Sequence, residues 1–298
     1  MMGHGEGKVM LPSTLVFGGS GFVGSALLRC RPPHLITRAI QHRHAIEAEV
    51  EILQGDLLQP TAPFGTWMRG MDRILMAARP SASTPRARRS MARATSKAMI
   101  RFLEALEERH VVAFHGSLSY GDQGDRFVPP SAEMDPVGYA RSYAIGERPL
   151  AHAIPHRAGT DLIRAPWILG TGSWFDLIYA TGPVPVHDGG HHWMSIVDVH
   201  ELATWAWAIE PAERGRILHA PLLARVRQRT FAHIVADLRG VELIHQTSSE
   251  LRRRHGRQAR DSMIASLRLT DDSGNDPESS ESVDALRDAI QSVIAGRS

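Results

Sequence analysis

A glycine-rich turn near the amino terminus constrains the fold more than any other feature of the sequence. Residues 14–24 read TLVFGGSGFVG, an apolar run followed by glycines with the spacing G-x-G-x-x-G. Between a strand and a helix, this spacing permits a tight turn, brings the backbone close to a pyrophosphate and points helix N–H groups at the anion. We expect a dinucleotide site here, and a glycine-rich turn without a ligand is the alternative.

Short apolar runs alternate with longer helical patterns along the first 170 residues, which predicts βαβ units and a parallel α/β sheet. The expected strands cover residues 13–17, 34–37, 50–54, 73–77, 111–115 and 160–163. The expected helices cover residues 21–29, 88–108 and 138–153.

The alternation of short apolar runs with helical patterns becomes less regular after residue 170. Residues 170–175 and 181–190 are rich in glycine or proline and are expected to be loops, whereas residues 197–208 have a helical pattern with an acidic first turn. We expect a nucleotide-binding domain over residues 10–170, completed by about 195–210, and a substrate lobe over 171–270. A mobile acidic and serine-rich segment over 271–282 and a helix over 283–298 would follow, the helix docking on its own chain or on a second subunit.

Composition excludes several classes of partner. The 34 basic and 32 acidic side chains nearly balance, so no nucleic-acid partner is expected. One cysteine, Cys30, allows no intrachain disulfide, and no apolar stretch is long enough for a membrane span or placed like a secretory signal. The expected setting is the cytoplasm, and the expected partner is a small-molecule substrate, with the chain a monomer or a homodimer.

The residues after the second expected strand indicate which dinucleotide binds. An acid about 20 residues beyond the turn normally takes the ribose hydroxyls of NAD, but here Thr37 is followed by Arg38, with Arg43 nearby. An arginine suits a 2′-phosphate, so NADP(H) is favoured, NAD(H) is possible, and a surface arginine is the alternative. Asp56 and Leu57, after the third expected strand, would lie by the adenine, unless Asp56 only caps a turn.

With these residues in place, the chain resembles the short-chain dehydrogenase/reductase superfamily, in its extended and atypical, epimerase-like branch. The resemblance rests on the glycine signature from Gly18, on Gly55-Asp56-Leu57, on the strand leading into residues 117–121 (SLSYG), on Tyr139 and Glu147, and on residues 164–170 (RAPWILG) and 195–199 (SIVDV). It implies a doubly wound parallel Rossmann sheet with a small C-terminal substrate lobe. It also implies a hydride-transfer site built from Ser, Tyr and Lys. The cofactor contacts that we carry over are Gly18, Ser20, Gly21, Phe22, Val23, Arg38, Asp56, Leu57, Ala77, Ala78, Pro166 and Ile168.

The lysine of that site is missing. The family's Tyr-x-x-x-Lys corresponds here to Tyr139 and Tyr143, and the only lysines, Lys8 and Lys97, cannot complete the motif. The family's serine pair is replaced by Gly116-Ser117 with one residue fewer, which makes Ser117 the best serine candidate, and Ala92 or Arg93 takes the place of a helix asparagine. We expect Ser117, Tyr139 and Tyr143 to form the catalytic set. Tyr139 and Tyr143 share one helix face, and packing or cofactor holding is the alternative role for both.

Without lysine to stabilise a tyrosinate base, reduction is favoured over alcohol oxidation. The leading hypothesis is an NAD(P)H-dependent reductase of a small, possibly aromatic or secondary-metabolite substrate, with Tyr139 as proton donor and Ser117 orienting the acceptor. A catalytically silent NADP-sensing protein and a sugar-nucleotide epimerase or dehydratase are the alternatives.

Three further features have more than one interpretation. The 16 histidines lack a metal-ligand pattern, so no metal is expected, and the histidines of 187–192 are either lid residues or solvent-facing. Trp174 and Phe175 line an apolar pocket or belong to a core. The arginine runs at 86–89 and 252–260 are interpreted as solvated helix faces.

Overall fold

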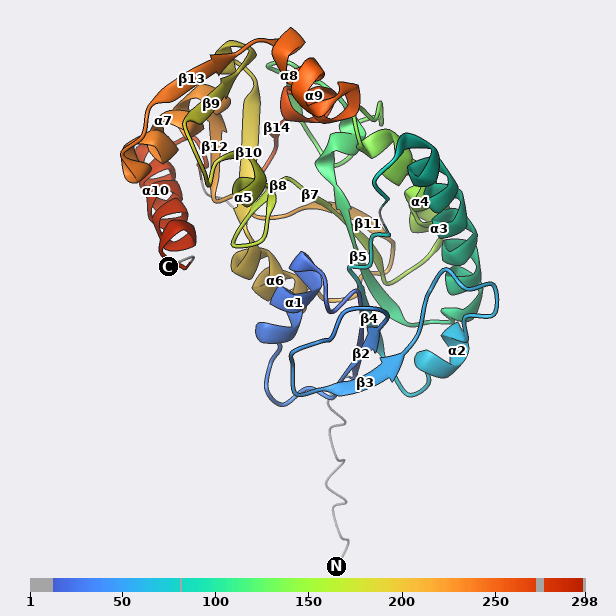
Figure 1. The fold of residues 1–298 in the computed structure, drawn as a ribbon. Helices are drawn as coiled ribbons and strands as arrows, with labels where there is room; N and C mark the ends of the chain where they lie inside the picture. The colour runs from blue at the N-terminus through green and yellow to red at the C-terminus, as the bar shows by residue number, and fades with distance from the viewer. Residues whose placement is uncertain (1–12, 81, 272–275, 297–298) are drawn as a thin grey trace, which may run out of the picture.

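A seven-stranded parallel sheet forms the centre of the protein in a computed structural model that describes residues 13–80, 82–271 and 276–296 (Figure 1). Its strand order is β11-β7-β5-β4-β1-β2-β3. The strands are β1 (Thr14–Phe17), β2 (Thr37–Gln41), β3 (Glu51–Gln54), β4 (Arg73–Met76), β5 (His110–Gly116), β7 (Thr160–Ala165) and β11 (Arg216–His219). Because the order runs outward from β1 and β4 in both directions, this is a doubly wound Rossmann sheet, and the predicted α/β fold class is confirmed.

Helices cover both faces of this sheet (Figure 1). One face carries α1 (Phe22–Arg29) and α6 (Val199–Ala208), and the other carries α2 (Phe64–Trp67), α3 (Pro85–Ala105) and α4 (Ala140–Ala153). Alternate strand residues supply the two cores: Val112 lies in the core under α1 and α6, and Val111 in the core under α3 and α4. The inner strands are therefore covered by apolar side chains on both faces, as a parallel sheet requires, whereas the edge strand β3 is largely exposed.

A smaller group of elements lies beyond the carboxyl ends of the central strands (Figure 1). Its sheets pair β8 with β10 and β12, β9 with β13, and β6 with β14. The strands are β6 (Phe127–Val128), β8 (Trp167–Leu169), β9 (Val184–His187), β10 (Trp193–Asp198), β12 (Ala224–Arg227), β13 (Leu243–Gln246) and β14 (Arg268–Leu269). The helices of the smaller group are α5 (Trp174–Ile178), α7 (Gln228–Arg239), α8 (Ser248–His255), α9 (Arg257–Met263) and α10 (Ser280–Ala295), with the short 3-10 helices η1 (Ser117–Tyr120) and η3 (Asp188–Gly190). We call this group of elements the lobe. The 3-10 helix η2 (Ile154–His156) is not part of it, since it joins α4 to the start of β7 and its Ile154 lies in the core under α3 and α4.

The second predicted strand is wrong in its position. Residues 34–37 were expected to form it, but β2 spans Thr37–Gln41 and pairs Arg38 with Leu15 on one side and Glu51 on the other. Ala39 and Ile40 supply the buried positions of this strand, whereas Ile36 is exposed. The strand therefore ends at Gln41, and the residues that can face a ligand at its carboxyl end are different from those expected.

The glycine- and proline-rich stretches after residue 170 are not all loops. The expected loop over 181–190 contains β9, and the stretch 170–175 runs into α5, where the Ser173 hydroxyl accepts a hydrogen bond from Phe175 N–H at 3.2 Å. Pro185 is tolerated in β9 because the strand pairs with β13 alone and is an edge strand. Trp174 and Phe175 lie in the aromatic core of the lobe, against Tyr179 and Phe231.

The predicted mobile segment over 271–282 falls partly on residues 272–275, which lie outside the described residues. The described remainder is held in place, since Glu278 pairs with Arg225 at 2.6 Å and with Arg268 at 2.6 Å. Helix α10 begins at Ser280, and its residues Leu286, Ile290 and Val293 are buried against the lobe. The final helix thus docks on its own chain, the first of the two expected arrangements.

Within the described residues, no helix is both long enough and apolar enough to cross a membrane.

Two histidines of the lobe are buried, and neither forms an ion pair within the described residues. His187 ends β9 and His192 follows η3, and their side chains are 2% and 8% exposed. Burial lowers the pKa of His187 to about 3 and that of His192 to about 4. Both are therefore neutral in the folded protein at neutral pH, whereas in the unfolded chain they take up protons below about pH 6.5.

We expect acid to destabilise the fold through these two histidines. Below pH 6.5 the unfolded chain binds more protons, so the free energy of unfolding falls by about 1.4 kcal/mol per pH unit for each histidine until the folded pKa is reached. Urea unfolding followed between pH 7 and pH 4 measures this slope. His187→Gln and His192→Gln should each reduce it. The exposed neighbour His191→Gln is the control, and an equal effect of that substitution would contradict the assignment.

Candidate functional site

The glycine turn lies directly against the end of β4. Gly18 has φ +83° and a Cβ placed on it would lie 2.6 Å from the backbone nitrogen of Ala78, so this position requires glycine. A Cβ on Gly24 would clash with the Gly18 carbonyl oxygen, so α1 can start this close to β1 only with glycine there. Ser20 and Gly21 are exposed, and no side chain caps α1. The first N–H groups of this helix are therefore free to bind the pyrophosphate of a dinucleotide.

Three segments that are distant in the sequence meet beside this turn. Phe22 and Val23 of α1, Ala77 after β4 and Ile168 of β8 all pack against the same core, the one under α1 and α6. Pro166 joins β7 to β8 between them. The structure thus brings these five expected cofactor contacts to one end of the sheet.

The adenine end differs from the expectation. Arg38 is the second residue of β2 and lies away from the carboxyl end of the sheet, where it donates to the carbonyls of Trp67 and Arg69 and pairs with Glu51 at 2.9 Å. The expected contact between Arg38 and the cofactor is therefore wrong, because the strand begins near Arg38 and does not end there.

The residues that do follow β2 are His42 and Arg43. His42 Nε2 lies 3.4 Å from Asp56 Oδ2, which joins the ends of β2 and β3, and Asp56 Oδ1 also accepts from Leu58 N–H at 2.9 Å. Asp56 thus caps its turn and also contacts His42, while Leu57 is the residue between Asp56 and Leu58 in this turn. Arg43 is exposed and makes no polar contact within the described residues.

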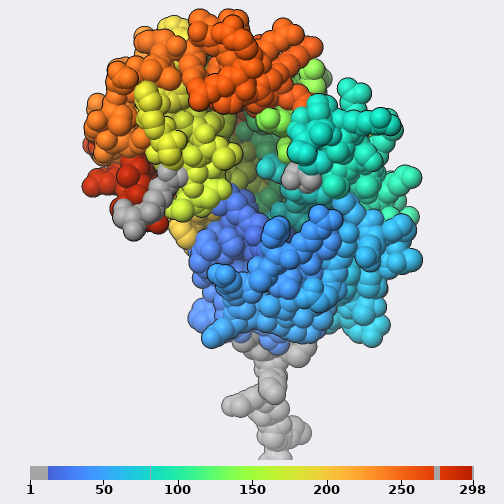
Figure 2. Space-filling model, in the orientation of Figure 1, coloured from blue at the N-terminus to red at the C-terminus, as the bar shows by residue number. Residues whose placement is uncertain are grey.

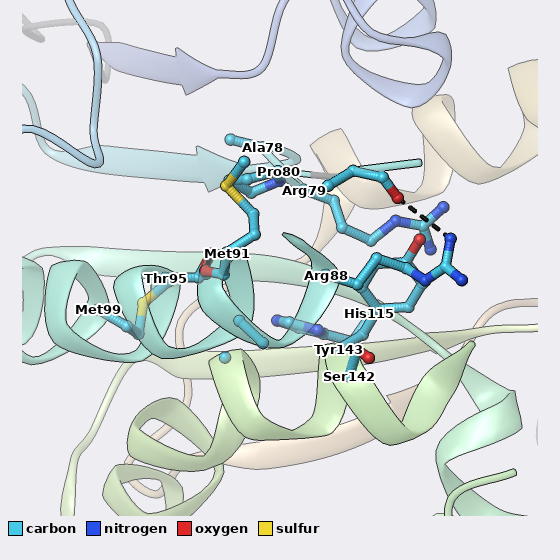
Figure 3. A pocket seen from close by; sticks show the side chains of 13 residues that line it. Ala78, Arg79, Pro80, Arg88, Met91, Thr95, Met99, His115, Ser142 and Tyr143 are labelled. Atoms are coloured by element: carbon cyan, nitrogen blue, oxygen red, sulfur yellow. Dashed lines mark hydrogen bonds between the residues drawn. The ribbon is translucent and has the colours of Figure 1, made fainter. Parts of the chain in front are cut away.

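A pocket opens where the glycine turn meets β4. Its empty space measures about 470 Å³, open solvent at its mouth included. The walls come from the segment after β4, from α3, from His115 of β5 and from α4 (Figure 3). The lining residues are Ala78, Arg79, Pro80, Ala82, Arg88, Met91, Ala92, Thr95, Met99, His115, Ser142, Tyr143 and Gly146. In the space-filling view the surface is hollowed between the lobe and the part that carries α3 (Figure 2).

Of the three predicted catalytic residues, only Tyr143 lines this pocket. Tyr139 precedes α4, one helical turn before Tyr143, and is partly buried outside the lining set. Ser117 begins η1 and is 4% exposed, so the chain turns its side chain into the protein at the place where β5 ends. The preceding Gly116 has no heavy atom within 4 Å of an added Cβ.

Two arginines that the sequence analysis did not assign to the site lie over the tyrosine rings. The Arg79 guanidinium is 4.6 Å from the centre of the Tyr143 ring, and the Arg88 guanidinium is 5.0 Å from the centre of the Tyr139 ring. Arg88 also bonds Gln258 of α9 and the Ser83 carbonyl. The interpretation of 86–89 as a solvated face therefore fails at Arg88, which holds α3 to the lobe.

A buried ionic cluster lies behind the pocket. His115 Nδ1 is 3.1 Å from Glu147 Oε2, and the other oxygen of Glu147 pairs with Arg164 NH1. Glu147 and Arg164 are each 1% exposed. Burial alone would raise the pKa of Glu147, but the hydrogen bond and charge of His115 and the charge of Arg164 outweigh it, and the pKa is lowered. Glu147 is therefore a carboxylate, and it fixes His115 at the pocket wall.

Sequence reasoning missed His115 because its partner lies 32 residues away on another element. The signal in the sequence was a polar residue, His115, at the end of an otherwise apolar run, facing the same side as Val111 and Ala113. Within the described residues, no group of three or more His, Cys, Asp or Glu side chains could hold a metal ion.

Comparison with known proteins agrees with this geometry. Residues 14–155 match the NAD dependent epimerase/dehydratase family. Comparison with curated protein sequences gives no match.

Solved structures share the fold over nearly the whole length. One is a dTDP-glucose 4,6-dehydratase from Streptomyces venezuelae with NAD bound, 16% identical, with 94% of this chain and 96% of that chain covered at a TM-score of 0.71. Another is a UDP-galactose 4-epimerase, 17% identical, with 96% and 99% covered at 0.68. A third is a short-chain dehydrogenase/reductase superfamily protein from Agrobacterium tumefaciens with NAD bound, 14% identical, with 96% and 99% covered at 0.69.

The family match covers the glycine turn, both tyrosines and Glu147, and the shared fold extends through the lobe. Residues 14–155 thus match the NAD dependent epimerase/dehydratase family, and the solved structures share the fold over nearly the whole chain.

Proposed function

We propose that the protein is an NAD(P)H-dependent oxidoreductase that reduces a small molecule in the pocket beside Ala78. The observation that carries the proposal is the shared position of Ala78. Its backbone abuts Gly18 of the glycine turn, and the same residue lines the pocket. A dinucleotide whose pyrophosphate binds at α1 therefore has its reactive ring within reach of that pocket.

The chemistry of the pocket wall suits a small apolar or aromatic substrate. Met91, Met99, Ala78 and Ala92 give it an apolar side, and thioethers make favourable contacts with aromatic rings. The tryptophans of the lobe do not add to this argument, since Trp174 belongs to the lobe core.

Reduction is the direction that the tyrosines support. Arg79 and Arg88 contact ring faces and make no hydrogen bond to either phenol oxygen within the described residues. They supply positive charge near both rings without taking the place of a lysine bonded to the ribose. A neutral tyrosine can give a proton to a substrate that receives hydride, and Tyr139 is the candidate donor from the sequence.

A sugar-nucleotide epimerase or dehydratase is the second candidate, because the matched family and two of the similar solved structures are described as epimerases or dehydratases. Such a reaction returns its hydride to the substrate, and the cofactor stays bound between turnovers. NAD retained in stoichiometric amount through purification would favour this candidate over the exchangeable NADPH of a reductase. A third candidate, a catalytically silent NADP-binding protein, would bind NADPH and turn over no substrate.

Arg43 is the residue that we propose for a 2′-phosphate, since it follows β2 and has no other polar partner within the described residues. Arg43→Ala should weaken NADPH by about tenfold or more relative to NADH, because a hydrogen bond to a charged group contributes about 1.5–3 kcal/mol. Titration of protein into each reduced nucleotide, followed by nicotinamide fluorescence, gives both dissociation constants. Arg38→Ala is the matched control and should leave their ratio unchanged. Equal weakening of both nucleotides by Arg43→Ala would refute the assignment.

Tyr143 is the residue that we propose as the ribose contact, in the place of the family's lysine. Tyr143→Phe removes the hydroxyl and keeps the ring under Arg79. We expect NADPH and NADH to bind about two- to tenfold more weakly, the loss of one neutral hydrogen bond. Tyr139→Phe makes the same change one helical turn earlier, outside the pocket lining, and should leave both affinities unchanged. The proposal is wrong if the two substitutions have the same effect on nucleotide binding.

A further inference from the structure

Strand β5 carries two histidines, and each begins a chain of three side chains. The histidine contacts a buried carboxylate that in turn pairs with an arginine, exposed in the case of Arg216 and buried in the case of Arg164. At the start of the strand, His110 Nε2 lies 3.1 Å from Asp161 Oδ2, and Asp161 Oδ1 pairs with Arg216 Nε at 2.8 Å. At its end, His115 Nδ1 lies 3.1 Å from Glu147 Oε2, and Glu147 pairs with Arg164. Both carboxylates are fully or almost fully buried and both have lowered pKa values, although burial alone would raise them.

The two chains differ in where they lie. Five positions separate the histidines, so their side chains leave opposite faces of the sheet as well as opposite ends of the strand. His115 is at the carboxyl end, where parallel sheets bind ligands, and it lines the pocket. His110 is at the amino end and is not part of that lining. Thus the second chain ends at the pocket, and the first lies at the opposite end of the sheet.

The two imidazoles also use different nitrogens. His110 hydrogen-bonds Asp161 through Nε2, its outer nitrogen, whereas His115 Nδ1 faces Glu147 in an ion-pair contact at 3.1 Å. Within the described residues Glu147 is the one polar partner of His115, so Nε2 is left without a hydrogen bond. An ionised carboxylate that accepts from Nδ1–H fixes the tautomer, orients the ring and stabilises the imidazolium.

We infer that His115 is the acid–base residue of the pocket, with Glu147 as its positioning residue. The inference rests on the proposed reductase function and names His115 in place of Tyr139 as the proton donor. The carbonyl carbon of the substrate receives the hydride that the reduced nicotinamide supplies. The π electron pair of the carbonyl becomes an O–H bond with the proton from Nε2, the carbonyl is reduced to an alcohol, and the neutral imidazole takes a new proton from water.

Glu147 lies one helical turn beyond Tyr143 and two turns beyond Tyr139 on α4, on the same side of the helix. The helix that carries the tyrosines therefore also carries the carboxylate that orients His115. Tyr139 has its ring under Arg88 and lies outside the pocket lining, whereas His115 is part of the lining (Figure 3).

The first test is spectroscopic and needs no substrate. Proton NMR of the full-length protein with NADPH should show two low-field N–H resonances, one for each imidazole bonded to a carboxylate. His115→Gln should remove one and His110→Gln the other. Glu147→Gln should remove the resonance that His115→Gln removes and leave that of His110. If Glu147→Gln leaves both resonances in place, the positioning role is overturned.

The second test is turnover of a chosen probe, 9,10-phenanthrenequinone, by single-turnover oxidation of NADPH. His115→Gln should slow the reaction by about 100-fold or more, the usual contribution of a general acid, with NADPH affinity unchanged. His110→Gln is the matched control and should keep the rate, with circular dichroism showing that it is folded at the assay temperature. Retained turnover in His115→Gln, with turnover lost in Tyr139→Phe, would overturn the inference and return the role to Tyr139.

Failure of the proposed function has a different signature. Wild-type protein that does not bind NADPH, or binds it and reduces neither the quinone nor p-nitrobenzaldehyde, counts against a reductase. Wild-type protein that binds NADPH and reduces the probe, with His115→Gln equally fast, counts against the role of His115 alone.

Discussion

The close approach of two backbones determines how the rest of this site is arranged. Gly18 lies so near Ala78 that no side chain fits between the glycine turn and the end of β4. This approach places the free N–H groups of α1 beside the pocket wall. It also determines which positions along α3 and α4 can line the pocket. One steric constraint therefore sets the positions of both the glycine turn and the pocket.

The sequence predicted those parts of the protein that depend on local pattern. Strands β1, β3, β4 and β5 and helix α1 lie within a few residues of their expected positions, because apolar runs bounded by turn residues identify buried parallel strands. Strand β2 was misplaced because the apolar pair Leu35-Ile36 resembled a strand core, whereas Ala39 and Ile40 are the buried residues. The nucleotide contact expected of Arg38 was wrong for this reason.

What the sequence could not show is how distant charged residues combine. The missing lysine indicated a site without positive charge near its tyrosines, yet Arg79 and Arg88 lie over both rings. His115, Glu147 and Arg164 come from three elements and form one buried cluster. No spacing rule along the chain predicts such pairs, because the α/β fold brings them together only after α4 has packed beside β5 and β7. The site is thus more polar and more positively charged than its motifs suggested.

Gly116 has a consequence for how such a site can change in evolution. The space at its Cβ is open, and the residue lies between His115 at the pocket and Ser117 inside the protein. A glycine codon of the form GGC or GGT becomes a serine codon by one nucleotide change. A hydroxyl at this position fits without rearranging the backbone, on the face of the strand opposite to the imidazole. The substitution Gly116→Ser would therefore give the tip of this strand both a hydroxyl and an imidazole, on its two faces.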